Sequence, residues 1–379
     1  MRYLVYILIV CSLIGTNFFV STGITWGDIF CAILLLISIL NLIQRRWIID
    51  RFCKLSALYL PSMLIAAIIN GEVTNTIFIN YFRNYFWGVL AYLSLSNSIN
   101  SIKDIRRCLV VSIAYLVYFL FNFRVLMQNS SYDTINTLDF GYGRNNVAFT
   151  SLLIAVFLEF LYYSKLARAY ILLGVVLMAI IILFCASRYA MIMLVISFLI
   201  FRVSSKQRIN LTEVTSFAVL AVIGFFIYNF VIGFIDTSFY EYSQTYLTEK
   251  LSDARADFWQ TRVMAINVKP ITEMLSSGNY LFLLFGSPIA VQHSFLSHTL
   301  ITTGVVGCLC YLISHIRLLV WIYKFKGVFL FLFIIVMVMF VNDFITNARF
   351  YVGVNSILYG AICAIIFKYI RINGNTSLS

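Results

Sequence analysis

Twelve apolar runs divide this chain, and each predicts a helix that crosses a lipid bilayer. They lie near residues 3–20, 26–43, 55–70, 82–98, 108–126, 146–163, 170–186, 189–203, 214–235, 296–316, 327–344 and 350–367. A bilayer core is roughly 30 Å thick and a helix rises about 1.5 Å per residue, so a crossing needs about 20 mostly apolar residues. The pattern therefore predicts an all-α polytopic membrane protein with about twelve transmembrane helices.

Composition supports this fold class. Of 379 residues, 62% are hydrophobic and 11% are charged, and the mean hydropathy is +0.94, so there is too little polar surface to cover a soluble globule. Arg2 precedes the first run without a small-x-small cleavage pattern after it, which predicts an uncleaved first span. The eight cysteines fall in or beside apolar runs, where a buried small hydrophobe is a better interpretation than a disulfide.

The basic residues predict the orientation. Every short loop on one side is basic, as the positive-inside rule requires of the cytoplasmic face, and both termini lie on that side. The outer face keeps nine basic and eleven acidic residues. The net charge of +12 is thus divided among short loops, which excludes one patch for nucleic acid. Eighteen of the 27 basic residues are assigned to the cytoplasm: Arg2, Arg45, Arg46, Arg51, Lys54, Lys103, Arg106, Arg107, Lys165, Arg168, Arg202, Lys206, Arg208, Arg317, Lys324, Lys326, Lys368 and Arg371.

We expect a single transmembrane domain over residues 1–379. Nearly all of the chain outside the membrane lies on the periplasmic side. The first periplasmic segment spans 127–145, and a large periplasmic loop spans 236–295. The loop is rich in aromatic and apolar residues, so we expect it to fold. Within it, 254–268 has helical apolar spacing and predicts an amphipathic surface helix.

Outward-facing arginines are the first candidates for chemistry. Arg188, in CASRYA, lies in a tight turn between two predicted spans, at the periplasmic boundary of the membrane. It is either a ligand-binding group or an anchor whose charge reaches the membrane surface. Arg255 and Arg262 are seven residues apart and share a face of the predicted surface helix. They either face a common ligand or pair with Asp253 and Asp257.

Three further positions complete the candidate set. Arg144 and Asn145, in GYGRNNVAF, mark either a binding position or a capped helix start. His293 lies where the large loop returns to the membrane, as a base for a hydroxyl group or as a hydrogen-bonded interface residue. Arg349 ends the late outer segment NDFITNAR. Arginines and a histidine on one face could bind a diphosphate and a sugar hydroxyl together. No carboxylate cluster for a divalent metal and no soluble-enzyme motif is present, so no cofactor is expected.

These residues lie in short motifs that resemble the O-antigen polymerase and O-antigen ligase superfamily of bacterial inner-membrane glycosyltransferases. The resemblance spans about 140–360. It rests on GRNNVAF (143–149), SRYA (187–190), RADFWQTRVMAINVKP (255–270), HSFLSHTLITTGVVG (293–307) and NDFITNAR (342–349).

The resemblance implies a membrane glycosyltransferase fold of the GT-C-like type and an active site on the periplasmic face. Its donor is an undecaprenyl-diphosphate-linked oligosaccharide, used without metal or nucleotide sugar. Arg188 and Arg255 then hold the diphosphate and neutralise it as it leaves, with Arg262 as the alternative in the same loop. His293 orients or deprotonates the acceptor hydroxyl, and Arg144, Asn145 and Arg349 join the substrate-binding set. Membrane lipid and a chain-length regulator protein are the further candidate partners.

Three functions stay open at this point. A polymerase extends one lipid-linked repeat unit with another during lipopolysaccharide biosynthesis, and a ligase transfers the polymer to lipid A core. GRNNVAF, the short chain and the high aromatic content favour the polymerase, although an Arg-x10-Gly pattern of some polymerases is absent from the outer loops. A lipid-linked oligosaccharide flippase would need charges deep in its spans. Glu159 is nearly the only candidate, and it lies near the cytoplasmic end of its helix.

Overall fold

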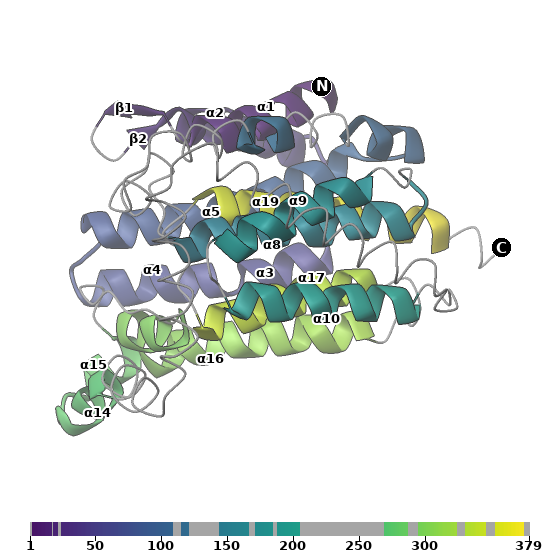
Figure 1. The fold of residues 1–379 in the computed structure, drawn as a ribbon. Coiled ribbons are helices and arrows are strands. Elements are labelled where there is room, and N and C mark those ends of the chain that lie inside the picture. The colour runs from purple at the N-terminus through teal and green to yellow at the C-terminus, as the bar shows by residue number, and fades with distance from the viewer. Residues whose placement is uncertain are drawn as a thin grey trace. The chain divides into compact units, whose positions relative to one another are not determined.

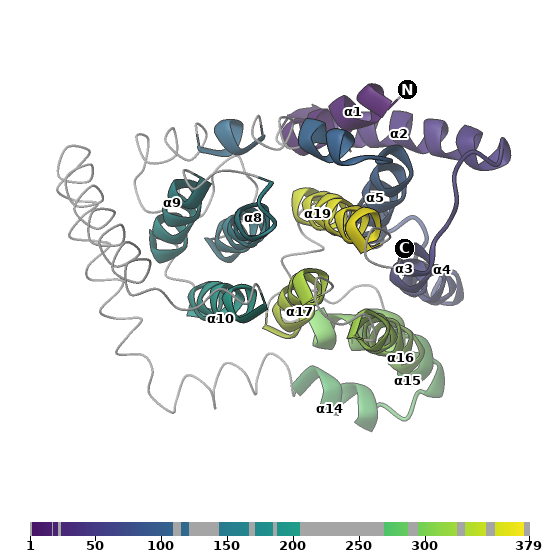
Figure 2. The same ribbon diagram turned by 90° about the vertical axis from the view of Figure 1, so that its right-hand side faces the viewer.

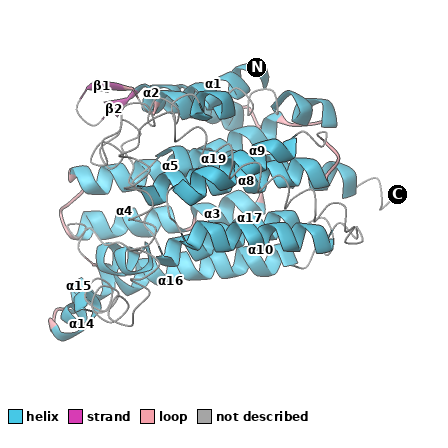
Figure 3. Ribbon diagram, viewed as in Figure 1, coloured by secondary structure: helices cyan, strands magenta, loops and turns pink. Residues whose placement is uncertain are grey.

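The protein is mostly helical, as the computed structural model shows in Figure 3. The structure describes residues 2–16, 18–21, 24–108, 115–120, 144–166, 171–184, 188–204, 269–286, 295–323, 330–345 and 353–374. In the first third of the chain the helices are α1 (Arg2–Gly15), α2 (Trp26–Ile43), α3 (Arg51–Ala57), α4 (Tyr59–Ile69) and α5 (Thr76–Ser98). The later ones are α8 (Arg144–Tyr163), α9 (Ile171–Phe184), α10 (Arg188–Ser204), α14 (Lys269–Ser276), α15 (Tyr280–Phe285), α16 (Phe295–Tyr323), α17 (Leu330–Ile345) and α19 (Gly353–Gly374).

Four helical stretches have the length and composition to cross a membrane. They are Trp26–Ile43, Arg51–Ile69, Thr299–Tyr323 and Gly353–Ile372. Shorter apolar helices cover Arg2–Gly15, Val147–Tyr163, Ile171–Ile182 and Tyr189–Ile200. Many large apolar side chains on these helices are exposed, among them Leu36 and Ile43 on α2, as expected of surfaces that face lipid. The chain is therefore an all-α membrane protein.

The described residues form two compact units. Unit 1 comprises Met1–Tyr115 and Arg255–Ser379, and unit 2 comprises Leu116–Ala254.

In unit 1, α1 and α2 form an antiparallel hairpin whose two glycines allow close approach. A Cβ atom on Gly15 would lie 2.7 Å from the backbone nitrogen of Gly27, and one on Gly27 would lie 2.7 Å from the Ser12 carbonyl oxygen. Small residues at such crossings let membrane helices pack backbone to backbone. Thr25 begins α2 by a reciprocal capping box with Asp28.

The link between these two helices corrects the predicted extent of the first span. The apolar run predicts helix to residue 20, but α1 ends at Gly15 and the chain forms strand β1 (Phe19–Ser21), antiparallel to β2 (Ile24–Thr25). Phe19 pairs with Thr25, and Ser21 pairs with Ile24. The aromatic and β-branched residues after Gly15 suit a strand, and hydropathy alone does not separate them from the helix.

The centre of unit 1 is the parallel pair of α5 and α19, which lie side by side in Figures 1 and 2. Gly88 of α5 faces Ser356 and Gly360 of α19, and added Cβ atoms would strike the opposite backbone. Farther along, Tyr92 and Phe367 pack with ring centroids 6.2 Å apart. Nearly all of α19 is buried, so this helix forms much of the core.

Helices α3, α4, α16 and α17 complete unit 1. Tyr59 of α4 packs edge-on against Tyr85 of α5 and Tyr311 of α16, with centroids 5.4 and 5.6 Å away. The Arg51 guanidinium lies 6.0 Å from the centre of the Trp321 ring. Residues 269–286 of the predicted periplasmic loop form α14 and α15, and α15 packs on α16.

Unit 2 contains α8, α9 and α10. Short connections join them, so their directions alternate and α8 runs parallel to α10. Gly174 of α9 lies against Leu158 of α8, which places the end of α8 beside the start of α9. The Ser197 hydroxyl of α10 and the Glu159 carboxyl of α8 are joined by a hydrogen bond, with 2.9 Å between Oγ and Oε2.

Candidate functional site

The predicted site residues divide into those with a described position and those without one. His293, Arg255, Arg262 and Arg349, together with the expected amphipathic helix at 254–268, lie outside the described residues. Arg188 begins α10, and Arg144 and Asn145 begin α8, so for these three the structure places the backbone.

The starts of α8 and α10 lie at the same end of unit 2, because the two helices are parallel. Their relative height follows from the Glu159–Ser197 hydrogen bond. Glu159 is fifteen residues after Arg144 and Ser197 is nine after Arg188. At 1.5 Å per residue, the start of α8 therefore extends about 9 Å beyond the start of α10. The structure brings three of the seven predicted positions to one end of a helix bundle.

Helix starts are favourable places for an anion. The first backbone N–H groups of a helix have no partner within it, and the helix dipole adds partial positive charge there. Phosphate groups bind at such positions in many proteins. Two helix starts that carry Arg144 and Arg188 have the electrostatic character needed for a diphosphate.

The motif at 293–307 contains a break in a membrane helix. Gly304 interrupts α16 with φ 65° and ψ −169°, a conformation that only glycine adopts readily. Helix α15 ends against the break, since a Cβ atom on Gly304 would strike the backbone of Leu284 and Phe285. The motif belongs to the family resemblance, but the sequence does not predict the break: its only signal is a glycine after two threonines in an apolar run.

Buried and partly buried polar side chains lie around this break. The Asn70 amide of α4 donates to the Phe285 carbonyl oxygen at 3.5 Å. The Thr303 hydroxyl donates to the Thr299 carbonyl at 2.7 Å and lies 3.5 Å from the Tyr59 hydroxyl. Irregular backbone at membrane depth requires such partners because lipid supplies none.

A second polar cluster, which is not among the predicted site residues, joins α2 to α5. The Arg83 Nε lies 3.2 Å from Asp28 Oδ1, and the Trp87 indole donates to the same carboxyl oxygen at 2.9 Å. Arg83 is four-fifths buried by side chain (22% exposed), so its charge requires the nearby carboxylate. The arginine was visible in the sequence, but a partner 55 positions earlier was not.

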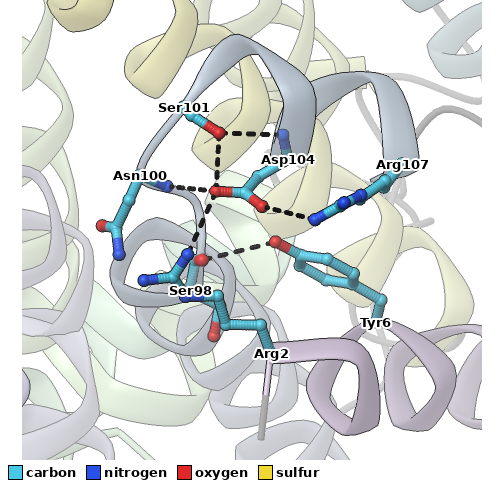
Figure 4. Close-up of polar contacts among 7 residues, drawn as sticks. All are labelled: Arg2, Tyr6, Ser98, Asn100, Ser101, Asp104 and Arg107. Atoms are coloured by element: carbon cyan, nitrogen blue, oxygen red, sulfur yellow. Dashed lines mark hydrogen bonds and ion pairs between the residues drawn. The ribbon is translucent and has the colours of Figure 1, made fainter.

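At the opposite end of unit 1, Asp104 is the centre of a network of hydrogen bonds and ion pairs, shown in Figure 4. Its carboxylate accepts hydrogen bonds from Ser101 at 2.9 Å and from the Asn100 backbone at 3.2 Å. Arg2 and Arg107 lie 3.5 and 3.4 Å away. Burial favours the neutral acid, but these hydrogen bonds and the two arginine charges outweigh it and lower the pKa of Asp104.

These contacts define two chemically different ends of unit 1. At the basic end, α1 begins beside Asp104, and Asn97 near the end of α5 bonds the backbone of Ile48. Basic residues gather there, namely Arg2, Arg45, Arg46, Arg51, Lys54, Lys103, Arg106, Arg107, Lys368 and Arg371. The other end carries the Asp28–Arg83 cluster and the α16 break.

No metal centre is visible in the part of the chain that the structure describes, where no three His, Cys, Asp or Glu side chains come together. His315, which the sequence places near the cytoplasmic side, is buried in α16 with its Nδ1 3.0 Å from the Tyr311 carbonyl oxygen. Its ring also stacks on Phe340. Such contacts are those of a packing residue.

Comparison with known proteins gives no match: no family model, no curated protein and no solved structure is similar to this chain at the significance required.

Proposed function

We propose that the protein is an O-antigen polymerase of the bacterial inner membrane, with about twelve spans of the GT-C-like type and a periplasmic active site. It joins undecaprenyl-diphosphate-linked repeat units by one inverting displacement. The acceptor hydroxyl attacks the anomeric carbon of the donor, the bond to the diphosphate breaks, and undecaprenyl diphosphate leaves. The hydroxyl proton passes to His293.

The observation that carries this proposal is that two of the motifs that resemble the family lie at helix starts. GRNNVAF and SRYA each open a helix, and both helices start at one end of unit 2. Arg188 is proposed to hold the donor diphosphate with Arg255, while Arg144 and Asn145 bind nearby parts of the substrate. The phosphoester bond of the donor supplies the energy, so no ATP-binding loop is required.

Two features of the described helices support the proposed orientation. The basic end of unit 1 suits the cytoplasmic face under the positive-inside rule, which supports the proposal that both termini are cytoplasmic. The end with Asp28, Arg83 and the α16 break then faces the periplasm. Glu159, the intramembrane acid that a flippase would use, is buried against Ser197, which favours an enzyme over a transporter.

The test is the lipopolysaccharide pattern of a strain that lacks the gene and carries wild-type or variant protein. Loss of a polymerase leaves core capped by one repeat unit. Loss of a ligase leaves bare core and long lipid-linked polymer, and loss of a flippase leaves intermediates on the cytoplasmic side.

We expect Arg188→Ala and His293→Ala to give the one-repeat pattern with normal membrane insertion, because each removes a group that stabilises the transition state. Arg202→Ala, at the other end of α10, and His298→Ala, five residues after His293, are matched controls that keep long chains. Full-length chains in the Arg188 and His293 variants would overturn the site assignment.

A further inference from the structure

Glu159 is a buried carboxyl inside an apolar membrane helix. Glu159 is 1% exposed. It lies on α8, against which α9 and α10 pack. Transfer of an unpaired carboxylate into such surroundings is far more costly than transfer of the neutral acid. An ionisable residue at this depth therefore requires an explanation beyond packing.

The hydrogen-bond geometry around Ser197 indicates whether Glu159 is protonated or ionised. Its Oγ lies 2.9 Å from Glu159 Oε2 and 2.8 Å from the Leu194 carbonyl oxygen. A serine hydroxyl has one hydrogen, whereas both neighbours of this oxygen are acceptors if Glu159 is ionised. One short contact would then lack a hydrogen. If Glu159 is protonated, it donates to Ser197 and Ser197 donates to Leu194, so both contacts are hydrogen bonds.

The titratable residues on the helices around Glu159 lie toward the helix ends. Helix α9 presents no titratable side chain between Ile171 and Phe184. On α10, Arg188 and Arg202 lie nine residues before and five after Ser197, and Tyr189 is next to the start. Helix α8 adds Tyr162 and Tyr163, and the following Lys165 is exposed.

The second carboxyl oxygen gives an independent indication. Oε1 of Glu159 is buried, and within the described residues it accepts no hydrogen bond. An ionised carboxylate would leave this oxygen with negative charge and no donor. A neutral carbonyl oxygen tolerates that position at much lower cost.

We propose that Glu159 is a proton-binding site: it holds a proton at neutral pH, donates it in a hydrogen bond to Ser197, and so fixes the register of α8 against α10. Loss of the proton places a charge between the helices and weakens their packing. The proposal concerns the protonation of one carboxyl and does not depend on the glycosyltransferase assignment.

The experiment is infrared difference spectroscopy of the purified full-length protein in detergent, wild type against Glu159→Gln. At neutral pH we expect the wild type alone to show the carbonyl band of a protonated carboxylic acid, sensitive to exchange into D2O. Glu72→Gln is the control, because Glu72 is only half-buried and accepts a hydrogen bond from Asn75. That difference should show carboxylate bands.

A melting series against pH supplies the second measurement. A folded state that keeps the proton loses stability as pH rises above about 4.3, where an unfolded glutamate ionises, until the folded carboxyl titrates. The melting temperature of the wild type should fall with pH relative to Glu159→Gln, whose amide still donates to Ser197. A carboxylate band for Glu159 at neutral pH, or equal pH slopes, would overturn the proposal.

Ser197→Ala keeps the proposal testable if the glutamine variant does not fold. The protonated carboxyl then loses its acceptor, so its carbonyl band should shift to higher frequency relative to the wild type. An unshifted band would show that Glu159 does not donate to Ser197.

Discussion

Asp104 shows how single residues fix one end of unit 1. Two of its partners, Arg2 and Arg107, come from α1 and from the helix that contains Asp104 itself, so the carboxylate ties the N-terminus to the chain after α5. Both arginines are about half exposed, which limits the value of each ion pair. The partly buried hydrogen bonds from Ser101 and Asn100 contribute the larger part.

Asp104→Asn should lower the free energy of unfolding by about 1 kcal/mol at neutral pH, because it removes a charge that four donors share. Since the folded-state pKa of Asp104 is depressed, its stabilisation is present above the ordinary value of about 3.9 and is lost as pH falls through the lower folded-state value. The difference between variant and wild type should vanish in acid. Unfolding of the detergent-solubilised proteins at several pH values measures it.

Lys103→Gln is the matched control for this prediction. Lys103 is exposed and next to Asp104, so its loss should change stability by less than about 0.5 kcal/mol at every pH. A difference between Asp104→Asn and wild type that stays constant with pH would contradict the assigned role of the carboxylate.

At the residue scale, sequence could predict where charge lies but not what it contacts. The positive-inside rule located Arg2 and Arg107 on one side, and the structure adds that both meet Asp104. Arg83 and Asp28 are among the basic and acidic residues that the charge pattern leaves on the outer face, and their pairing depends on the packing of α2 against α5. Contacts between residues so far apart require the fold.

At the scale of elements, the glycines decide how closely helices approach and where they break. Gly304 interrupts α16 and Gly278 lies between α14 and α15, and both have φ near +65°. They differ in surroundings. An added Cβ atom strikes the α15 backbone at Gly304, whereas at Gly278 it meets nothing within 4 Å.

Gly304→Ala should therefore cost about 3 kcal/mol or more, from backbone strain together with steric overlap. Gly278→Ala carries only the conformational cost of about 1 kcal/mol. Thermal unfolding of both variants in detergent separates the two terms. Equal losses would mean that α15 does not press against the break.

Within the part of the chain that the structure describes, hydropathy located most helices, because long apolar runs stand out from the polar loops between them. The span predicted at 214–235 and most of the one at 108–126 lie outside the described residues. Helix α2 has the predicted bounds, and α8, α9 and α10 differ from theirs by a few residues. Helix α16 extends to Tyr323, beyond the predicted end at 316. In its last turns, Trp321 packs against Arg51 of α3 and Phe367 of α19. The break at Gly304 was not predicted, because membrane helices tolerate glycine without breaking.

For the whole molecule, the separation of charge connects the fold with the proposed reaction. One end of unit 1 is basic, and the other has a largely buried arginine, a broken helix and aromatic side chains. The proposed reaction needs lipid-linked donor and acceptor on one face, and it needs cations that neutralise a leaving diphosphate without a metal. In unit 2, α8 and α10 start at the same end, and their first residues, Arg144 and Arg188, are two of the predicted arginines.

The most direct test of this account is polymer formation by the purified protein. Wild type and Arg188→Ala are mixed with undecaprenyl-diphosphate-linked repeat units in detergent containing EDTA, and the products are separated by chain length. The account predicts lengthened lipid-linked glycan and released undecaprenyl diphosphate with the wild type only. Wild-type protein that is folded yet forms no polymer, or forms it only with added metal, would contradict the account.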